Sequence, residues 1–298
     1  MSFSVDVKRE LCELRQPNCC ALAECYGMLL FSRSFGLEKI NFQTTNEAVC
    51  HRFAARIKKF FDIFSIIESG GEKKVNYKIC YKNSEETAKI VSYFGYKSDI
   101  NFINVEILKK ECCVHAFLRG VFLAAGQVSD PEKDYRLEIS LKNPLICKDF
   151  LELCTDLGFA FKISSRSGAT MLYLKDSNVI EEFLTVIGAT NAAILIMQSK
   201  IYKDMRNKVN RINNRETANI FKAVDAAIQQ RAAIEILEKK GIADSLEPEL
   251  VSAIKLRKEN PEASLTELCR ISSEPITRSG LNHRFRRILE IAQEKNKD

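Results

Sequence analysis

The sequence has few glycines and prolines and no long uninterrupted apolar run. Its 298 residues include 12 Gly and 6 Pro, and no stretch is low in complexity, which excludes collagen-like and linker-like composition. The longest apolar stretch, Ala116–Gly126, is interrupted by Arg119 and is far shorter than the roughly 20 residues that a membrane helix needs. The N-terminus has no apolar signal-peptide core. We expect no membrane partner and a cytoplasmic location.

The 11 cysteines do not follow a recognised metal-site spacing, because no CxxC occurs and the three histidines lie far apart. The odd count and the missing export signal argue against a disulfide framework. The adjacent pairs Cys19-Cys20 and Cys112-Cys113 are weak metal candidates. The alternative is that reduced cysteines pack as small apolar residues on helices. We favour this second interpretation and predict neither a metal nor a cofactor.

Charge is distributed unevenly along the chain. Residues 200–298 include 20 basic and 15 acidic residues, whereas the preceding part is almost balanced. The surplus lies in 200–231, with eight basic and three acidic residues, and in 278–287, with four basic residues and no acidic one. A basic region of this kind suits a polyanion such as double-stranded DNA.

The first 190 residues contain an internal duplication. A shift of 93 positions aligns Gly27 with Gly120, and a shift of 97 aligns Asn46 with Asn143, as a longer loop in the second copy requires. Each copy, about 17–96 and 110–189, has the pattern of a helix, a strand, a second helix, a hairpin and a closing helix, the last at 84–94 and 177–187. We predict an α+β domain of two pseudo-symmetric repeats over residues 1–193.

The first helix of each copy has two small residues one turn apart. They are Ala23 and Gly27 in one copy, and Ala116 and Gly120 in the other. Each helix could pack against the sheet of its own copy. Alternatively, the two helices could meet on the pseudo-twofold axis, where small residues allow close backbone approach.

Two segments at these helices resemble the paired nine-residue motifs of LAGLIDADG homing endonucleases. They are CYGMLLFSR, residues 25–33, and LRGVFLAAG, residues 118–126. In that family the eighth position of each motif is an acidic residue that binds the divalent metal for DNA cleavage. Ser32 and Ala125 occupy these positions here, and neither is a ligand for a hard cation. We therefore predict degenerate catalytic positions and no nuclease activity.

Other catalytic readings have little support in the sequence. Asp130 and Glu132 follow the second motif, and Glu38 has a loosely comparable place in the first copy. Because the two loops differ in length, we do not expect these residues to form a pair and interpret them as solvated loop carboxylates. No GxSxG, Walker-type glycine loop or HExxH occurs. We predict that the protein is not an enzyme.

Residues 194–233 have the pattern of one long helical linker, with an apolar stripe and no Pro or Gly. The run MRNKVNRINNRETAN, residues 205–219, has five asparagines, which form helices poorly and hydrogen-bond well. Its polar face is either a phosphate-contacting or domain-docking surface or simply a solvated one. The candidate residues are Arg206, Asn207, Asn210, Arg211 and Arg215.

Residues 234–298 predict an all-α helix-turn-helix domain, with the motif at about 263–296. Ser264 and Glu267 form a capping-box pattern before a short helix. After a turn, a last helix begins near Thr277. Its predicted buried stripe is Leu281, Phe285, Ile288 and Ala292.

The other face of this last helix is rich in Arg and Asn. In a helix-turn-helix domain such a helix enters the major groove, where Arg reads guanine and Asn reads adenine. An ordinary three-helix bundle with a solvated basic face is the alternative. Asn282 is the favoured base reader among the candidate DNA-binding residues, which are Thr277, Arg278, Ser279, Asn282, His283, Arg284, Arg286 and Arg287.

The combination of both parts resembles the WhiA family of bacterial regulators over nearly the whole chain. The segments that carry the resemblance are FLRGVFLAAGQVSDPEKDYRLEI, MRNKVNRINNRETANIFKAVDAA and PEASLTELCRISSEPITRSGLNHRFRRILEIA. The resemblance implies a nucleoid-associated, DNA-binding transcription regulator that acts in sporulation, or in cell division and chromosome segregation. It suggests RNA polymerase or a sigma factor as protein partners. The rival functions are a protein-interaction adaptor and a residual metal-dependent DNA endonuclease.

Overall fold

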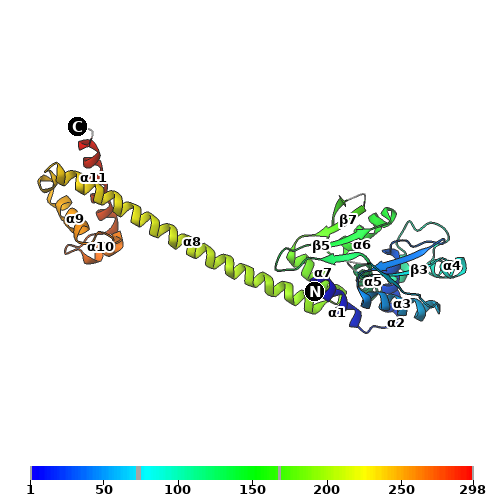
Figure 1. The fold of residues 1–298 in the computed structure, drawn as a ribbon. Coiled ribbons are helices and arrows are strands. Elements are labelled where there is room, and N and C mark those ends of the chain that lie inside the picture. Colours follow the sequence, from blue (N-terminus) through cyan, green and yellow to red (C-terminus); the bar gives the residue numbers. More distant parts are fainter. Residues whose placement is uncertain (1, 72–74, 167–168, 297–298) are drawn as a thin grey trace. The chain divides into compact units, whose positions relative to one another are not determined.

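The computed structural model describes residues 2–71, 75–166 and 169–296. It divides into two compact units, residues 1–203 and 204–298. In the first unit, helix α1 (Phe3–Glu13) precedes two copies of one motif (Figure 1). The first copy is α2 (Asn18–Leu30), β1 (Ile40–Thr44), α3 (Glu47–Phe61), β2 (Glu68–Gly70), β3 (Asn76–Tyr81) and α4 (Ser84–Tyr93).

The second copy repeats this order after a short 3-10 helix, η1 (Val105–Leu108). It consists of α5 (Glu111–Ala125), β4 (Gly126–Val128), β5 (Leu137–Leu141), η2 (Pro144–Ile146), α6 (Cys147–Asp156), β6 (Lys162–Arg166), β7 (Ala169–Leu174) and α7 (Ser177–Ile187). The predicted duplication and the α+β class are confirmed.

Equivalent residues of the two copies have equivalent structural roles. Asn46 and Asn143 each begin a helical segment by accepting a backbone N–H at their side-chain oxygen. Gly95 and Gly188 each follow a closing helix with a positive φ, 87° and 97°, a conformation that glycine adopts without a side-chain clash. The same local sequence signals therefore start and end equivalent helical segments in both copies.

Each copy has its own antiparallel sheet. The strand order is β1-β3-β2 in the first copy and β4-β5-β7-β6 in the second. Inward residues such as Phe42 and Ile79 are paired across the first sheet, as Ile139 and Leu172 are across the second. The second copy also contains β4, which pairs with β5. At the equivalent place the first copy has an isolated bridge between Ser34 and Asn41, so the change in register comes from the longer loop between β4 and β5.

Helices α2 and α5 pack directly against each other, so the second of the two predicted packings is correct. A methyl group at Gly120 would lie 2.1 Å from the carbonyl oxygen of Glu24, and one at Gly27 would lie 2.4 Å from that of Phe117. The two backbones are thus in contact at the glycines. We call this α2–α5 interface the seam.

The second unit contains α8 (Thr190–Lys239) from residue 204 onward, followed by η3 (Ala243–Ser245), α9 (Pro248–Glu259), α10 (Leu265–Ile271) and α11 (Arg278–Lys295). Helix α8 is longer at both ends than the predicted 194–233. Its first turns pack into the first core through Ala192 and Ile196, and its last turns pack into the second core through Ile234 and Leu237. Because these end turns are buried in the two cores, the helix is longer than the segment that the sequence pattern predicts.

Candidate nucleic-acid interface

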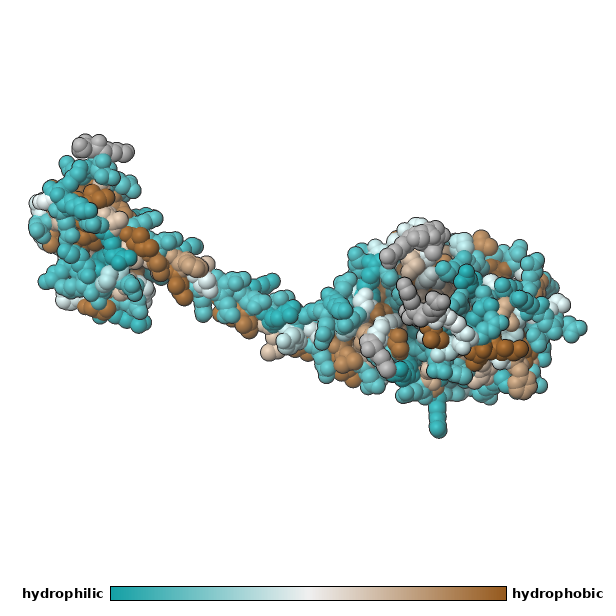
Figure 2. Space-filling model, viewed as in Figure 1, coloured by the Kyte–Doolittle hydropathy of each residue, from teal (hydrophilic) through white to brown (hydrophobic). Residues whose placement is uncertain are grey.

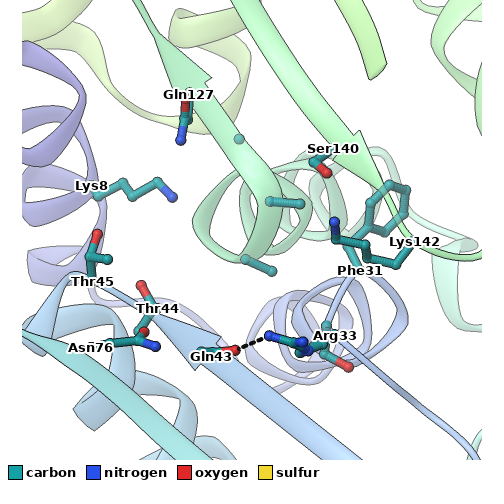
Figure 3. Close-up of a pocket in the computed structure, with 14 residues that line it drawn as sticks. Lys8, Phe31, Arg33, Gln43, Thr44, Thr45, Asn76, Gln127, Ser140 and Lys142 are labelled. Carbon is teal, nitrogen blue, oxygen red and sulfur yellow. Dashed lines mark hydrogen bonds between the residues drawn. The ribbon is translucent and has the colours of Figure 1, made fainter. Parts of the chain in front are cut away.

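The degenerate motif positions meet at one end of the seam. Ser32 follows α2, and Ala125 is the last residue of α5. Both line a cavity of about 610 Å³ between the two sheets, in which Lys8, Arg33 and Lys142 are the basic side chains (Figure 3). None of its described lining residues is Asp or Glu. This cavity has the chemistry of an anion site and lacks the carboxylates that Mg²⁺ prefers.

Two of the polar groups at this cavity already have partners. The Ser32 hydroxyl donates to the carbonyl oxygen of Ser34 at 2.9 Å, and an Arg33 nitrogen donates to the Gln43 side-chain oxygen at 2.8 Å. The acidic residues that follow the second motif lie outside the cavity. Asp130 and Glu132 are in the β4–β5 turn, where the Asp130 carboxylate accepts the backbone N–H of Glu132. They do not line the cavity.

Lys8 has an unusual electrostatic environment in the cavity. Burial lowers the pKa of its ammonium group to about 8. The ammonium donates to the carbonyl oxygen of Leu123, in the last turn of α5, at 3.1 Å. Lys8 is therefore partly neutral at mildly alkaline pH, and an anion in the cavity would favour its charged form.

A buried ionic cluster that no sequence pattern predicted lies in the middle of the seam. Glu24 on α2 is fully buried and binds Arg52 and Arg56 from α3 and Arg119 from α5, at nitrogen–oxygen distances of 2.6, 3.1 and 2.8 Å. Burial would raise the pKa of Glu24, but the hydrogen bond and the charges of the arginines outweigh it and lower that pKa. The only signal in the sequence was an acidic residue within an apolar helix.

The second unit has the arrangement that its sequence predicts. Ser264 caps α10, and Glu267 completes the capping box. Thr277 caps α11 by accepting the N–H of Gly280 at 3.1 Å. The predicted stripe on α11 is fully buried and consists of Leu281, Phe285, Ile288 and Ala292.

Arg257 fixes the segment before α10, a role that the sequence did not indicate. Its guanidinium is buried and donates to the side chain of Gln230 at 3.0 Å and to the carbonyl oxygen of Ala263 at 2.6 Å. It also lies 5.3 Å from the centre of the Phe285 ring. One side chain thus joins α8, α9, the loop between α9 and α10, and α11.

Most candidate DNA-binding side chains lie together on the exposed face of α11 and at its N-terminus. Arg284 differs, because it is only 19% exposed and pairs with Glu249 at 3.2 Å and Glu274 at 3.8 Å. Arg287 is exposed and pairs with Glu290 one turn later. The exposed set is Thr277, Arg278, Ser279, Asn282, His283, Arg286 and Arg287.

The candidate residues of α8 are also exposed. They are Arg206, Asn207, Asn210, Arg211 and Arg215. The same stretch has exposed apolar side chains, including Val209 and Ile212, which are about half accessible. Figure 2 shows brown patches among teal residues along this helix. The predicted apolar stripe is therefore largely on the surface.

No helix in the described part of the chain has the length and apolar character needed to cross a membrane.

A duplicated LAGLIDADG-like domain with degenerate motif positions, followed by a helix-turn-helix domain, defines the class of protein. Residues 114–206 match the WhiA LAGLIDADG-like domain, and residues 209–292 match the WhiA C-terminal HTH domain. The probable cell division protein WhiA of Carboxydothermus hydrogenoformans is 34% identical over 98% of this chain and 97% of its own. The Ruminiclostridium cellulolyticum protein of the same name is 36% identical over 100% and 99%. The chain belongs to the WhiA family.

A solved structure has the same fold over its whole length. The crystal structure of full-length DUF199/WhiA from Thermatoga maritima matches with a TM-score of 0.59 and 23% sequence identity, covering 99% of each chain. This likeness concerns the fold. It agrees with the order of domains described above.

Proposed function

We propose that this protein is a sequence-specific DNA-binding transcription regulator whose helix α11 reads bases in the major groove. The observation that carries the proposal is the exposed face of α11, where Asn282, Arg286 and Arg287 lie opposite a fully buried apolar stripe. Arg and Asn are the side chains that make bidentate contacts with guanine and adenine. Thr277, Arg278 and Ser279, at the start of α11, are suited to phosphate.

Other basic residues have supporting roles in this proposal. Arg284 positions α11, because its ion pairs join this helix to Glu249 on α9 and to Glu274 in the turn. Arg206, Arg211 and Arg215 on α8 contact phosphates without reading bases. His283 is a further phosphate or base contact.

The N-terminal domain acts as a non-catalytic scaffold in this proposal. Its cavity at the seam carries lysine and arginine in place of carboxylates, which supports anion binding over metal-dependent cleavage. RNA polymerase or a sigma factor is the proposed protein partner. Incubation of supercoiled plasmid with the protein and Mg²⁺ tests the absence of nuclease activity, and cleavage that a chelator stops would contradict it.

Duplex affinity across a salt series tests the role of α11. The double variant Arg286→Ala/Arg287→Ala is compared with Lys239→Ala/Lys255→Ala, which removes the same charge from exposed positions on α8 and α9. A base-reading arginine contributes about 1–3 kcal/mol, so the α11 variant should bind a specific duplex at least about 10-fold more weakly. Equal affinities of the two variants would contradict the assignment.

A second comparison separates the two domains. A chain that ends at Lys239 lacks α9 to α11 and should lose the steep salt dependence of the full chain. If it binds duplex DNA as well as the full chain does, the N-terminal domain or the basic face of α8 holds the DNA instead of α11.

The biological process is proposed from the relatives, which are named probable cell division proteins. We place this protein in the regulation of cell division, with sporulation and chromosome segregation as the processes that the family resemblance adds. A fluorescent fusion that follows the nucleoid in dividing cells would support this location, and diffuse fluorescence would contradict it.

One observation favours a protein-interaction adaptor as the second candidate. Exposed apolar residues lie along α8 beside its basic ones, among them Met205, Ile220 and Val224, and such surfaces often contact other proteins. Failure of the full chain to bind any duplex at low salt would favour the adaptor.

A further inference from the structure

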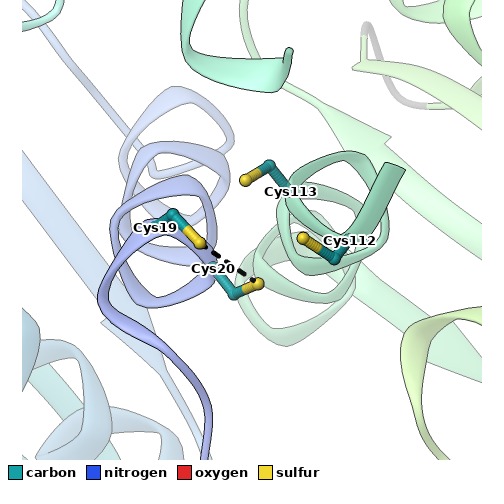
Figure 4. Close-up of side chains that lie close together, drawn as sticks. All are labelled: Cys19, Cys20, Cys112 and Cys113. Atoms are coloured by element: carbon teal, nitrogen blue, oxygen red, sulfur yellow. Dashed lines mark hydrogen bonds between the residues drawn. The ribbon is translucent and has the colours of Figure 1, made fainter. Parts of the chain in front are cut away.

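Four cysteine thiols from the two copies converge at the other end of the seam. Cys19 and Cys20 are in the first turn of α2, and Cys112 and Cys113 are in the first turn of α5. Their sulfur atoms all lie within 4.8 Å of one another (Figure 4). In the sequence, neither pair by itself has metal-ligand spacing. Seam packing creates the group of four.

We propose that these four cysteines bind one Zn²⁺ ion that fastens the N-terminal ends of α2 and α5 together. Structural zinc sites are tetrahedral and commonly use four cysteine thiolates at about 2.3 Å. That bond length places neighbouring sulfur atoms about 3.8 Å apart. The Cys19 and Cys20 sulfurs are already 3.9 Å apart, so the group needs to contract by at most about 1 Å to reach a tetrahedral site.

The surroundings of the cluster suit thiolate ligands. Both pairs lie at helix N-termini, where the unpaired backbone N–H groups and the helix dipole stabilise negative charge. Lys110, immediately before α5, adds a positive charge close to Cys19. These positive contributions offset part of the charge of an ion held by four thiolates.

The cluster combines access with shielding. Cys19 and Cys112 are exposed, whereas Cys20 and Cys113 are buried. An ion can therefore enter from solvent and reach two shielded ligands.

The chemistry of four sulfur ligands favours zinc over harder ions and over an iron–sulfur cluster. Soft thiolates select ions such as Zn²⁺, whereas Mg²⁺ and Ca²⁺ require oxygen ligands. Four sulfurs within 4.8 Å enclose a single ion, and a cluster of several irons needs a wider cage. The site is also separate from Ser32 and Ala125, which lie at the C-terminal ends of the same helices.

Metal content of the full chain tests the proposal. Protein purified under reducing conditions should contain one zinc per chain by mass spectrometry, and Co²⁺ in place of zinc should give the strong visible absorption of tetrahedral cobalt thiolate. The variant Cys19→Ser/Cys112→Ser alters only the two exposed ligands and should lose both signals. The control, Cys80→Ser/Cys147→Ser, also removes one cysteine from each copy and should keep them.

Thermal unfolding gives an independent readout. Zinc should raise the unfolding temperature of the wild type and the control, because an ion that binds only the folded state stabilises it, and it should not raise that of the Cys19→Ser/Cys112→Ser variant. Three results would overturn the proposal: a reduced wild-type chain that binds no zinc or cobalt, equal metal content in all three proteins, or a disulfide across the seam in place of the ion.

Discussion

At the scale of single residues, Gly120 determines how closely α5 approaches α2. A β-carbon there would overlap the Glu24 carbonyl oxygen, and neither backbone can yield without separating the helices. We therefore expect Gly120→Ala to lower the free energy of unfolding by about 1–3 kcal/mol, the usual cost of overpacking a core. Urea unfolding followed by circular dichroism measures this change.

Gly36→Ala is the matched control for that prediction. A β-carbon at Gly36 meets no atom within 4 Å, so its effect should stay within about 1 kcal/mol. Similar losses for the two variants would show that the seam tolerates an added methyl group, against the packing described here.

Glu24 balances three arginines in the same interface. Glu24→Gln leaves these cations buried without their anion, and we expect a loss of about 3–5 kcal/mol in the free energy of unfolding. Glu68→Gln, which removes an exposed pair with Lys78, should cost no more than about 1 kcal/mol. If the two variants lose the same stability, the buried cluster does not hold the seam.

The pH dependence of stability follows from the same residue. The pKa of Glu24 is lower in the folded protein than its usual value of 4.5. Its stabilising contribution is therefore complete above pH 4.5 and is lost as the pH falls through the folded pKa. Glu24→Gln should reduce the difference in unfolding temperature between pH 6 and pH 3 relative to the wild type, and an unchanged difference would contradict the assignment.

At the scale of elements, the capping box of α10 holds the first helix of the motif in place. The Ser264 hydroxyl accepts the N–H of Glu267, and the Glu267 carboxylate accepts the N–H of Ser264. Ser264→Ala should destabilise the second unit by about 0.5–2 kcal/mol. Thr266→Ala, at an exposed position in the same helix, is the control. Thermal melts of the two variants would be indistinguishable if the cap were unimportant.

Helices with strong local signals were predictable from the sequence. Helix α7 has the predicted bounds, Ser177–Ile187, because Asp176 caps it and Gly188 ends it. The duplication also indicated the seam, although the sequence left its packing open. Contacts between distant segments were not predictable. Glu24 forms an ion pair with Arg119 from the other copy, and no local sequence pattern predicts that contact.

At the scale of the whole molecule, the two units have separate hydrophobic cores. The second core contains Leu237, Leu250, Leu268 and Phe285 and is distinct from the core around the seam. We expect a fragment of residues 204–298 to fold alone and to melt cooperatively by circular dichroism. Calorimetry of the full chain should then show two transitions. A fragment without a cooperative melt would contradict this independence.

The seam joins two copies that belong to one chain, and this sets how the protein responds to dilution. Identical halves on separate chains would part at low concentration, since their association depends on mass action. Here the connecting segment holds each half at a fixed effective concentration near the other. The N-terminal domain therefore remains assembled even when a cell contains only a few molecules of the protein.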